Sequence, residues 1–563
     1  MATKTPARAG APAETGYSAG TPLNPPSPLL TTPTSDRSHR AGLRGLTNYV
    51  ASSSTREGRF GRLFRNLPVL SHSEEALNTL ASAMVTKAEE DLQLGGADPE
   101  ETETNRGEHM IPAGYTYLGQ FIDHDLTFDP ASSLERQNDP DALVNFRTPA
   151  FDLDNVYGRG PSDQPYLYDQ SEGSKGLLFL LGDEMKAGPS TSYDLPRNTQ
   201  GRALIGDPRN DENGIVSQLQ GVMLRFHNRM VEHVRIERGL TGDDLFKEAQ
   251  RLVRWHYQWV VVHDFLPRMV GNEMMAAVLP ETPIAAYGQN GASAGASYAR
   301  PNLRFYHPDH AFMPVEFAVA AYRFGHSMIR PIYSINGDFD NATKKRKTIF
   351  GENPETKEKG PSGNLTGFGR PTMNHGIEWK YFFEMGATSA GDLPQPAYRI
   401  DQQLVNALGD LPDPIAIANK SLARRNLIRG LRMGLPSGQT VARKMGFAPI
   451  RDADLLVGPH PDKVDKRPSI TEMGSEFRDN APLWYYILRE AEYYHQGMQL
   501  GPVGGTIVAE TFVGLLYEDR LSYLRVEPTW KPDPYVVTSG RKFKSGTGSF
   551  GMPELIRFAL ADE

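Results

Sequence analysis

The sequence predicts a mainly α protein: a single large helical domain with long loops and little sheet. Apolar residues recur at helical spacing over residues 216–234 and 245–269, and such spacing is typical of amphipathic helices. Residues 421–436 end in a Gly-Leu-Pro sequence, which commonly stops a helix. No repeat period is visible along the chain, and this argues against solenoids and propellers.

Composition narrows the classes of protein that the chain can represent. Its 563 residues include no cysteine, so disulfides and thiolate ligands are excluded. The net charge is only −8 and no basic block is present, which makes nucleic acid a poor candidate partner. No stretch approaches the roughly 18 apolar residues of a transmembrane helix.

The chain divides into three expected regions. Residues 1–45 are rich in Ala, Thr, Pro, Ser and Gly, which predicts a disordered N-terminal tail without a recognisable signal peptide. Residues 46–530 are expected to form the large domain, with residues 531–563 as a loop and helix packed on it. We expect a soluble protein, either cytoplasmic or exported, of undetermined oligomeric state.

Residues 118–125 place four polar side chains between apolar neighbours. In a helix, Gln120, Asp123 and His124 share one face, at positions i, i+3 and i+4, whereas Asp125 is turned about 100° away from His124. Such a cluster destabilises a core unless a cofactor, metal or substrate meets it there. The stretch therefore predicts the start of an active site.

A second polar run follows in residues 148–158. Oxygen donors at Thr148, Asp152 and Asp154, with the Ala150 carbonyl between them, alternate along an expected extended loop. This pattern suits a hard cation, and Asp125 could complete its ligand set. An Asp-rich turn that caps the next helix explains the same spacing equally well.

Two later segments have ordinary local interpretations. Arg209 and Glu212 lie three residues apart at a helix entrance, where a cap and a surface charge are usual. Residues 313–330 predict one helix that carries Arg323 and His326, and a lone histidine is more often a core residue than a ligand. Gly325, however, would let a flat group approach the backbone, and the charge of Arg323 suits an anionic cofactor.

Residues 336–372 are charged and rich in glycine, and they predict a surface excursion without a site.

Taken together, in chain order from about residue 114 to 524, these segments resemble the animal haem peroxidases of the peroxidase-cyclooxygenase superfamily. The resemblance implies haem b and Ca²⁺ as cofactors. It implies that His124 is the distal histidine, with Gln120 as its polar companion, and that Arg209 is the distal arginine. It further implies that His326 is the iron ligand, that Asn426 accepts a hydrogen bond from this ligand, and that Arg429 lies near a haem propionate. It also suggests two ester links to haem and five calcium ligands: Asp123 and Glu212 for the links, and Asp125, Thr148, Ala150, Asp152 and Asp154 for calcium.

The implied function is a peroxidase that reduces hydrogen peroxide and oxidises small donors, which would be halides, thiocyanate or phenols. The residue types suit this chemistry, because His124 can move a proton near neutral pH and Arg209 can stabilise charge on a departing oxygen.

Two alternatives remain beside this function. One is a haem fatty-acid dioxygenase of the same superfamily. Those enzymes carry a tyrosine three residues before the proximal histidine, a position that Arg323 occupies here with Tyr322 one residue away. The other is a calcium-binding structural or adhesion protein without catalysis. The joint presence of four residues disfavours it: His124, Arg209, His326 and Asn426.

Overall fold

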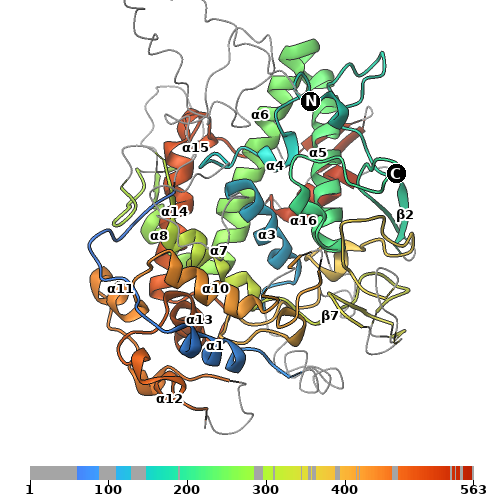
Figure 1. The fold of residues 1–563 in the computed structure, drawn as a ribbon. Helices are drawn as coiled ribbons and strands as arrows, with labels where there is room; N and C mark the ends of the chain where they lie inside the picture. Colours follow the sequence, from blue (N-terminus) through green and yellow to red (C-terminus); the bar gives the residue numbers. More distant parts are fainter. Residues whose placement is uncertain are drawn as a thin grey trace, which may run out of the picture.

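The computed structural model is built mainly from helices (Figure 1). It describes residues 60–87, 110–127, 147–187, 190–283, 296–298, 300–307, 311–340, 342–343, 345–352, 357, 363–386, 394–413, 415–416, 419–458, 467–532, 535–538, 541–544 and 550–560. The expected tail, residues 1–45, lies outside these ranges. Every sheet within them is two-stranded, and the predicted fold class is therefore confirmed.

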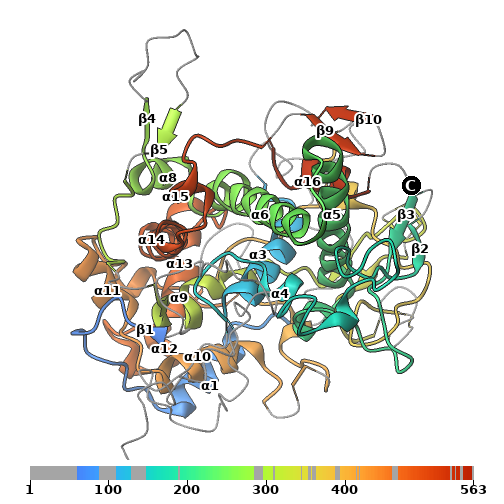
Figure 2. The same cartoon turned by 90° about the horizontal axis from the view of Figure 1, so that it is seen from above.

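Helix α3 (Gly114–Leu126) lies near the middle of the fold (Figure 2). It contacts α4 (Asp154–Tyr157), α5 (Gly214–Arg238) and the short 3-10 helices η6 (Pro208–Asp211) and η8 (Ala321–His326). Its buried side chains include Leu118, Phe121, Ile122 and Leu126. Burying each of them stabilises the fold by about 1.5–3 kcal/mol, so α3 is held firmly while its polar side chains face elsewhere.

The other α-helices pack around this centre. They are α1 (Glu74–Ala83), α6 (Gly242–Val260), α7 (Leu266–Val270), α8 (Asn272–Val278), α9 (Val315–Val319), α10 (Leu422–Arg432), α11 (Gly438–Met445), α12 (Ile470–Met473), α13 (Leu483–His495), α14 (Pro502–Glu518), α15 (Tyr523–Val526) and α16 (Met552–Leu560). Further 3-10 turns are η5 (Pro165–Leu167), η10 (Trp379–Tyr381), η12 (Asn406–Leu408), η13 (Asp452–Asp454) and η14 (Ser475–Phe477).

The strands are short and paired two by two. The pairs are β1 (Phe60–Gly61) with β6 (Met313–Pro314), β2 (Glu184–Ala187) with β3 (Ser190–Tyr193), β4 (Glu281–Pro283) with β5 (Ala296–Tyr298), β7 (Ile332–Tyr333) with β8 (Lys347–Thr348), and β9 (Tyr535–Thr538) with β10 (Arg541–Lys544). The first pair is parallel and the others are antiparallel.

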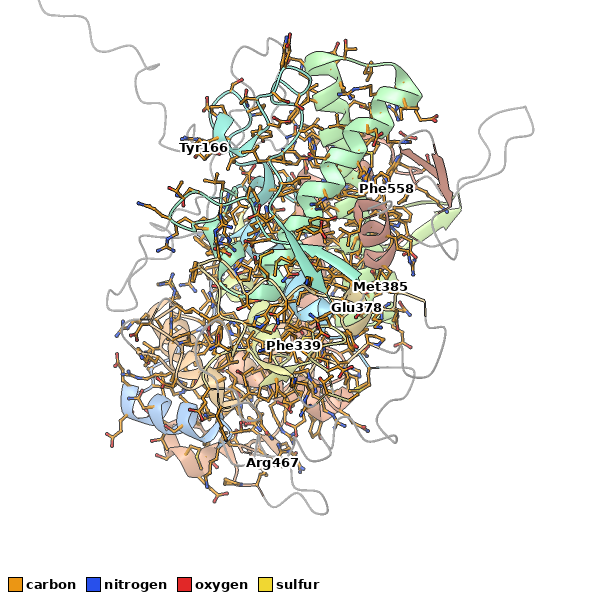
Figure 3. The ribbon with its side chains drawn as sticks, turned by 90° about the vertical axis from the view of Figure 1, so that its right-hand side faces the viewer. Tyr166, Phe339, Glu378, Met385, Arg467 and Phe558 are labelled. Carbon is orange, nitrogen blue, oxygen red and sulfur yellow. The ribbon has the colours of Figure 1, made fainter. Side chains whose placement is uncertain are left out.

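Helix α5 shows how the long helices are delimited and covered. Asn213 caps its start, because its side chain accepts hydrogen bonds from the backbone nitrogens of Ile215 (3.1 Å) and Val216 (3.0 Å). Helix α16 then packs along α5, where the ring centroid of Phe558 lies 5.3 Å from that of Phe226 (Figure 3). The end of the described chain thus covers part of the core.

The expected helix over residues 245–269 is interrupted. Helix α6 ends at Val260, and a π-helical turn, η7 (Val261–Phe265), precedes α7. Pro267 lacks an N–H and its ring would clash with the carbonyl four residues earlier, so a wider turn accommodates it.

The expectation of one helix over residues 313–330 was wrong. Helix α9 ends at Val319, and the 3-10 helix η8 carries the chain on to His326. At the break, Arg323 Nε donates a hydrogen bond to the Ala318 carbonyl at 2.9 Å. A side chain therefore satisfies a carbonyl that a continuous helix would have used. Among the described residues, no helix is both long and apolar enough to cross a membrane.

Candidate active site

A cavity of about 460 Å³ lies between α3 with η6 on one side and α9, η8 and α10 on the other. This volume is within the usual range for cofactor sites. All nine predicted catalytic and cofactor-binding residues line it: Gln120, Asp123, His124, Arg209, Glu212, Arg323, His326, Asn426 and Arg429. The folded chain thus brings together residues that are as much as 309 positions apart in the sequence.

His124 is oriented by a residue that sequence reasoning missed. Its Nδ1 lies 2.6 Å from Asn210 Oδ1, while the Asn210 amide nitrogen donates to Gln220 Oε1 at 2.8 Å. The second bond directs the Asn210 oxygen toward the ring, so Nδ1–H donates and Nε2 is left as the basic atom. Burial, reinforced by the positive charge of Arg209, lowers the pKa of His124 to about 4. The imidazole is therefore neutral and able to accept a proton at neutral pH.

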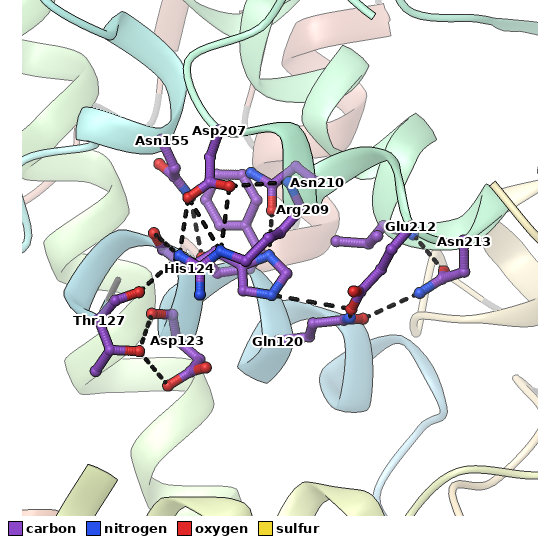
Figure 4. A network of polar contacts seen from close by, with 12 residues as sticks. Gln120, Asp123, His124, Thr127, Asn155, Asp207, Arg209, Asn210, Glu212 and Asn213 are labelled. Atoms are coloured by element: carbon purple, nitrogen blue, oxygen red, sulfur yellow. Dashed lines mark hydrogen bonds and ion pairs between the residues drawn. The ribbon is translucent and has the colours of Figure 1, made fainter. Parts of the chain in front are cut away.

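Arg209 is held by another residue that the sequence analysis did not single out, Asp207. Arg209 Nη2 donates to Asp207 Oδ2 at 2.8 Å and to the Thr127 carbonyl at 2.6 Å (Figure 4). Asp207 is completely buried and also accepts a hydrogen bond from Arg147. Its oxygen caps η6 by accepting from the Arg209 backbone nitrogen at 2.9 Å. The carboxylate thus fixes both the backbone and the side chain of the predicted distal arginine.

Gln120 links the helix α3 to the turn after η6. Its amide nitrogen donates to Glu212 Oε1, and its oxygen accepts from Asn213 Nδ2 at 3.1 Å (Figure 4). The same Glu212 oxygen lies 3.9 Å from His124 Nε2. Burial raises the pKa of Glu212 to about 7, despite the nearby charge of Arg209. Glu212 therefore exchanges a proton near neutral pH, directly beside His124.

Asp123, the other residue suggested for an ester link, lines the cavity next to this network. One of its oxygens accepts a hydrogen bond from Thr127 Oγ1 at 3.1 Å. The carboxylate is thus held at the cavity wall.

On the opposite wall, His326 lies beside Asn426, the residue that the resemblance pairs with it. The Asn426 amide nitrogen lies 2.9 Å from His326 Nδ1, and the amide oxygen accepts from Arg323 Nη1 at 3.4 Å. Arg323 thus helps to hold the amide of Asn426 beside the ring. Burial and the charge of Arg323 lower the pKa of His326 to about 3, so the imidazole is neutral.

The backbone beside His326 leaves room for a flat group. A Cβ atom placed on Gly325 would meet no atom within 4 Å, and Gly325 lines the cavity. Arg323 and Arg429 line the same wall, together with Arg425, which the sequence analysis missed. Arg425 and Arg429 are four residues apart on α10 and hence share one face of that helix.

One expectation about the loops was wrong. Ile349 and Phe350, inside the supposed surface excursion of residues 336–372, line the cavity. Charged residues surround these two apolar residues in the sequence, so the sequence alone did not predict that they line the cavity.

The predicted calcium residues gather beside α3, away from the cavity. Asp125, Asp152 and Asp154 are all buried. Asp125 Oδ2 accepts from the Leu153 backbone nitrogen at 3.2 Å, and Thr148 Oγ1 donates to Asp152 Oδ2 at 2.6 Å. Burial and the charges of Asp152 and Asp154 raise the pKa of Asp125.

These carboxylates are not arranged as a finished metal site. In the described part of the chain, no three His, Asp or Glu side chains form a group that could hold a metal ion without rearrangement. Ala150 is buried in the same loop, and its nitrogen donates to the Thr148 carbonyl at 2.8 Å. Mutual repulsion of three buried carboxylates is nevertheless the condition that a divalent cation relieves.

Comparison with known proteins places these residues in context. The family model described as animal haem peroxidase matches residues 131–530, more than half of the chain. The α3 residues precede the matched range. Thyroid peroxidase of Sus scrofa is 25% identical over 430 residues, covering 72% of this chain and 40% of that protein. Dual oxidase of Drosophila melanogaster is 25% identical over 325 residues, covering 56% of this chain and 18% of that protein. The chain thus spans less than half the length of either relative.

Two solved structures share the fold. Peroxidase A of Dictyostelium discoideum matches with a TM-score of 0.54 and 16% identity, covering 87% of this chain and 93% of that one. A fatty acid α-dioxygenase of Arabidopsis thaliana matches with a TM-score of 0.53 and 15% identity, covering 86% and 76% of the two chains. At such identities the match concerns the fold alone.

Proposed function

Since the chain belongs to the animal haem peroxidase family, we propose that it binds haem b in the cavity and uses hydrogen peroxide to oxidise small electron donors. The observation that carries the proposal is the placement of His124 and Arg209 on one wall and His326 on the other. A neutral imidazole on the His326 wall suits a ligand of haem iron. His124 and Arg209 supply the acid–base and electrostatic groups that peroxide cleavage requires.

The residues present fit a haem. His326 would ligate the iron, Asn426 and Arg323 would orient that ligand, and the Gly325 backbone leaves space beside it. Arg323 and Arg429 would pair with the propionates. Bound haem would supply the redox chemistry of peroxide reduction.

The protein's own part in the reaction is proton transfer and charge stabilisation. His124 Nε2 would take a proton from one peroxide oxygen and return it to the other, which departs as water. Arg209 would stabilise the negative charge that develops on the departing oxygen, because its anchored guanidinium needs no reorientation. Gln120 and Glu212 would hold peroxide or water beside His124. For a phenolic donor, each peroxide takes two electrons and two protons from two phenols and yields two waters and two phenoxyl radicals.

Two finer features are also proposed. Calcium would bind Asp125, Thr148, the Ala150 carbonyl, Asp152 and Asp154, and would offset the repulsion between the buried carboxylates. Asp123 and Glu212 both line the cavity and could form ester links to haem. Acid extraction tests the links, because haem that is entirely removed by acidic solvent is not ester-linked.

The test of the main proposal is an absorption spectrum of the purified protein before and after hydrogen peroxide is added. We expect a Soret band that changes on addition of peroxide and returns when a phenol or iodide is supplied. Absence of the Soret band after haem supplementation would refute the proposal and favour the structural alternative. Oxygen uptake with linoleate, without peroxide-dependent donor oxidation, would favour a dioxygenase.

A further inference from the structure

The cavity has more positive than negative side chains. Its wall contains four arginines: Arg209, Arg323, Arg425 and Arg429. Among the described residues, the acids that line it are Asp123 and Glu212, and Glu212 is partly protonated near neutral pH. Arg209 is neutralised by Asp207 behind the wall. Two propionates would require two of the remaining three arginines. Asp123 lies on the α3 wall, where Thr127 Oγ1 donates to it, so it does not serve as the ion-pair partner of the third guanidinium.

Arg425 is the arginine without a partner. No atom of the described residues accepts a hydrogen bond from its guanidinium or forms an ion pair with it, and the negative charge that raises its pKa is that of Glu212. Partial burial lowers its pKa, which shows that the surroundings do not compensate its charge. Arg424, the next residue, contrasts with it, because Arg424 donates to Asn78 Oδ1 and lies 4.0 Å from a carboxylate oxygen of Glu74. A partly buried cation at a cavity wall is an anion-binding group.

The cavity that Arg425 lines also has apolar residues in its wall. Leu422 lies one turn earlier on α10, and Leu408, Leu411 and Ile415 line the cavity from the segment before that helix. Phe350 adds an aromatic side chain from the loop after β8. Ile415, Leu422 and Phe350 are only partly buried by the protein itself. A ligand with one negative group and an apolar body would cover them and pair with Arg425 at the same time.

We propose that Arg425 binds the carboxylate of an amphipathic organic acid at the cavity wall. Where the body of this acid is a phenol, two molecules each give one electron and one proton to one hydrogen peroxide, which yields two waters and two phenoxyl radicals. The inference rests on the proposed function, because Arg323 and Arg429 are there assigned to the propionates. It specifies the ligand class: a monocarboxylate with an aromatic or aliphatic body, in preference to a neutral phenol. The ligand's charge would give specificity, and its apolar body would give affinity.

The test measures, by calorimetry and without peroxide, the binding of small carboxylates to the haem-containing protein. The probes are 4-hydroxyphenylacetate and decanoate, with 4-methylphenol and decanol as their uncharged counterparts. We expect both the wild type and Arg424→Gln to bind at least one carboxylate. In Arg425→Gln the Kd of that carboxylate should rise about 10- to 100-fold, the usual effect of losing a charged hydrogen bond, while the uncharged probe changes less than about twofold. Arg425→Lys should restore part of the affinity. The better carboxylate identifies the body as aromatic or aliphatic.

Two results would overturn the proposal. One is equal carboxylate affinity in wild type and Arg425→Gln, or no carboxylate binding at all. The other is loss of haem from Arg425→Gln, measured as the ratio of Soret to protein absorbance, since Arg425 would then hold the cofactor. The binding measurement needs no turnover. A protein that binds the carboxylate but does not react with peroxide would therefore refute the proposed reaction and still support the anion site.

Discussion

Replacing Asp207 with asparagine should both destabilise the protein and disable Arg209. The carboxylate is completely buried, accepts from Arg209 Nη2 at 2.8 Å and pairs with Arg147 on its other side. Burial alone would raise the pKa of Asp207, but the charges of Arg209 and Arg147 outweigh it and hold the pKa well below its ordinary value. Asparagine keeps the shape of the side chain and removes the charge that two guanidinium groups share.

The size of the effect follows from burial. Removing one partner of a buried ion pair costs about 3–5 kcal/mol, because the remaining charge stays buried without compensation. Asp183→Asn is the matched control, since Asp183 pairs with Arg370 at 2.9 Å on the exposed surface, where such pairs contribute about 0–1 kcal/mol. Urea unfolding of the two variants beside the wild type measures the difference in the free energy of unfolding.

The second consequence of Asp207→Asn concerns the reaction. A guanidinium that has lost its anchor no longer meets the departing oxygen in a fixed position, and such losses slow reactions by about 100-fold. Stopped-flow mixing with hydrogen peroxide measures this rate for the haem-containing variants. If Asp207→Asn unfolds no more easily than Asp183→Asn and reacts with peroxide at the wild-type rate, the role assigned to Asp207 is wrong.

Three other predictions separate the roles of neighbouring residues. His124→Ala should abolish the reaction with peroxide and retain the Soret band, whereas Asp125→Asn should loosen calcium and haem together; identical phenotypes would contradict this division. Asn426→Ala should speed haem loss to apomyoglobin about tenfold, because the axial histidine loses its orienting partner, and unchanged loss would count against it. In the folded protein, burial raises the pKa of Glu212 from 4.5 to about 7. The protonated carboxyl therefore contributes its full stability below pH 4.5, and this contribution is lost as the pH rises through about 7. Relative to wild type, haem-free Glu212→Gln should therefore gain about 3 kcal/mol of unfolding free energy between pH 4 and 8, and a difference independent of pH in urea unfolding would refute the shift.

Much of the fold follows from the sequence by itself. Apolar spacing predicted a helix where α5 occurs, and the Gly-Leu-Pro sequence predicted the end of α10, because an amphipathic face and a local stop signal are properties of consecutive residues. The polar residues of α3 also identified the cavity wall, since a buried cluster of this kind requires a partner. The motif resemblance supplied His326 and Asn426, which local patterns alone did not distinguish from core residues.

Only the tertiary structure determined which distant residues support the site. Asn210 meets His124 across 86 positions of sequence, and Asp207 meets Arg147 across 60. The density of polar residues from 207 to 213 was visible in the sequence, but its partners were not. Arg425 lies among several arginines of α10, and nothing in the spacing shows that it alone faces the cavity without an anion. Helical periodicity reports which face of a segment is apolar. The partner of each polar side chain depends on how separate segments pack, and that is decided only when the whole core is formed.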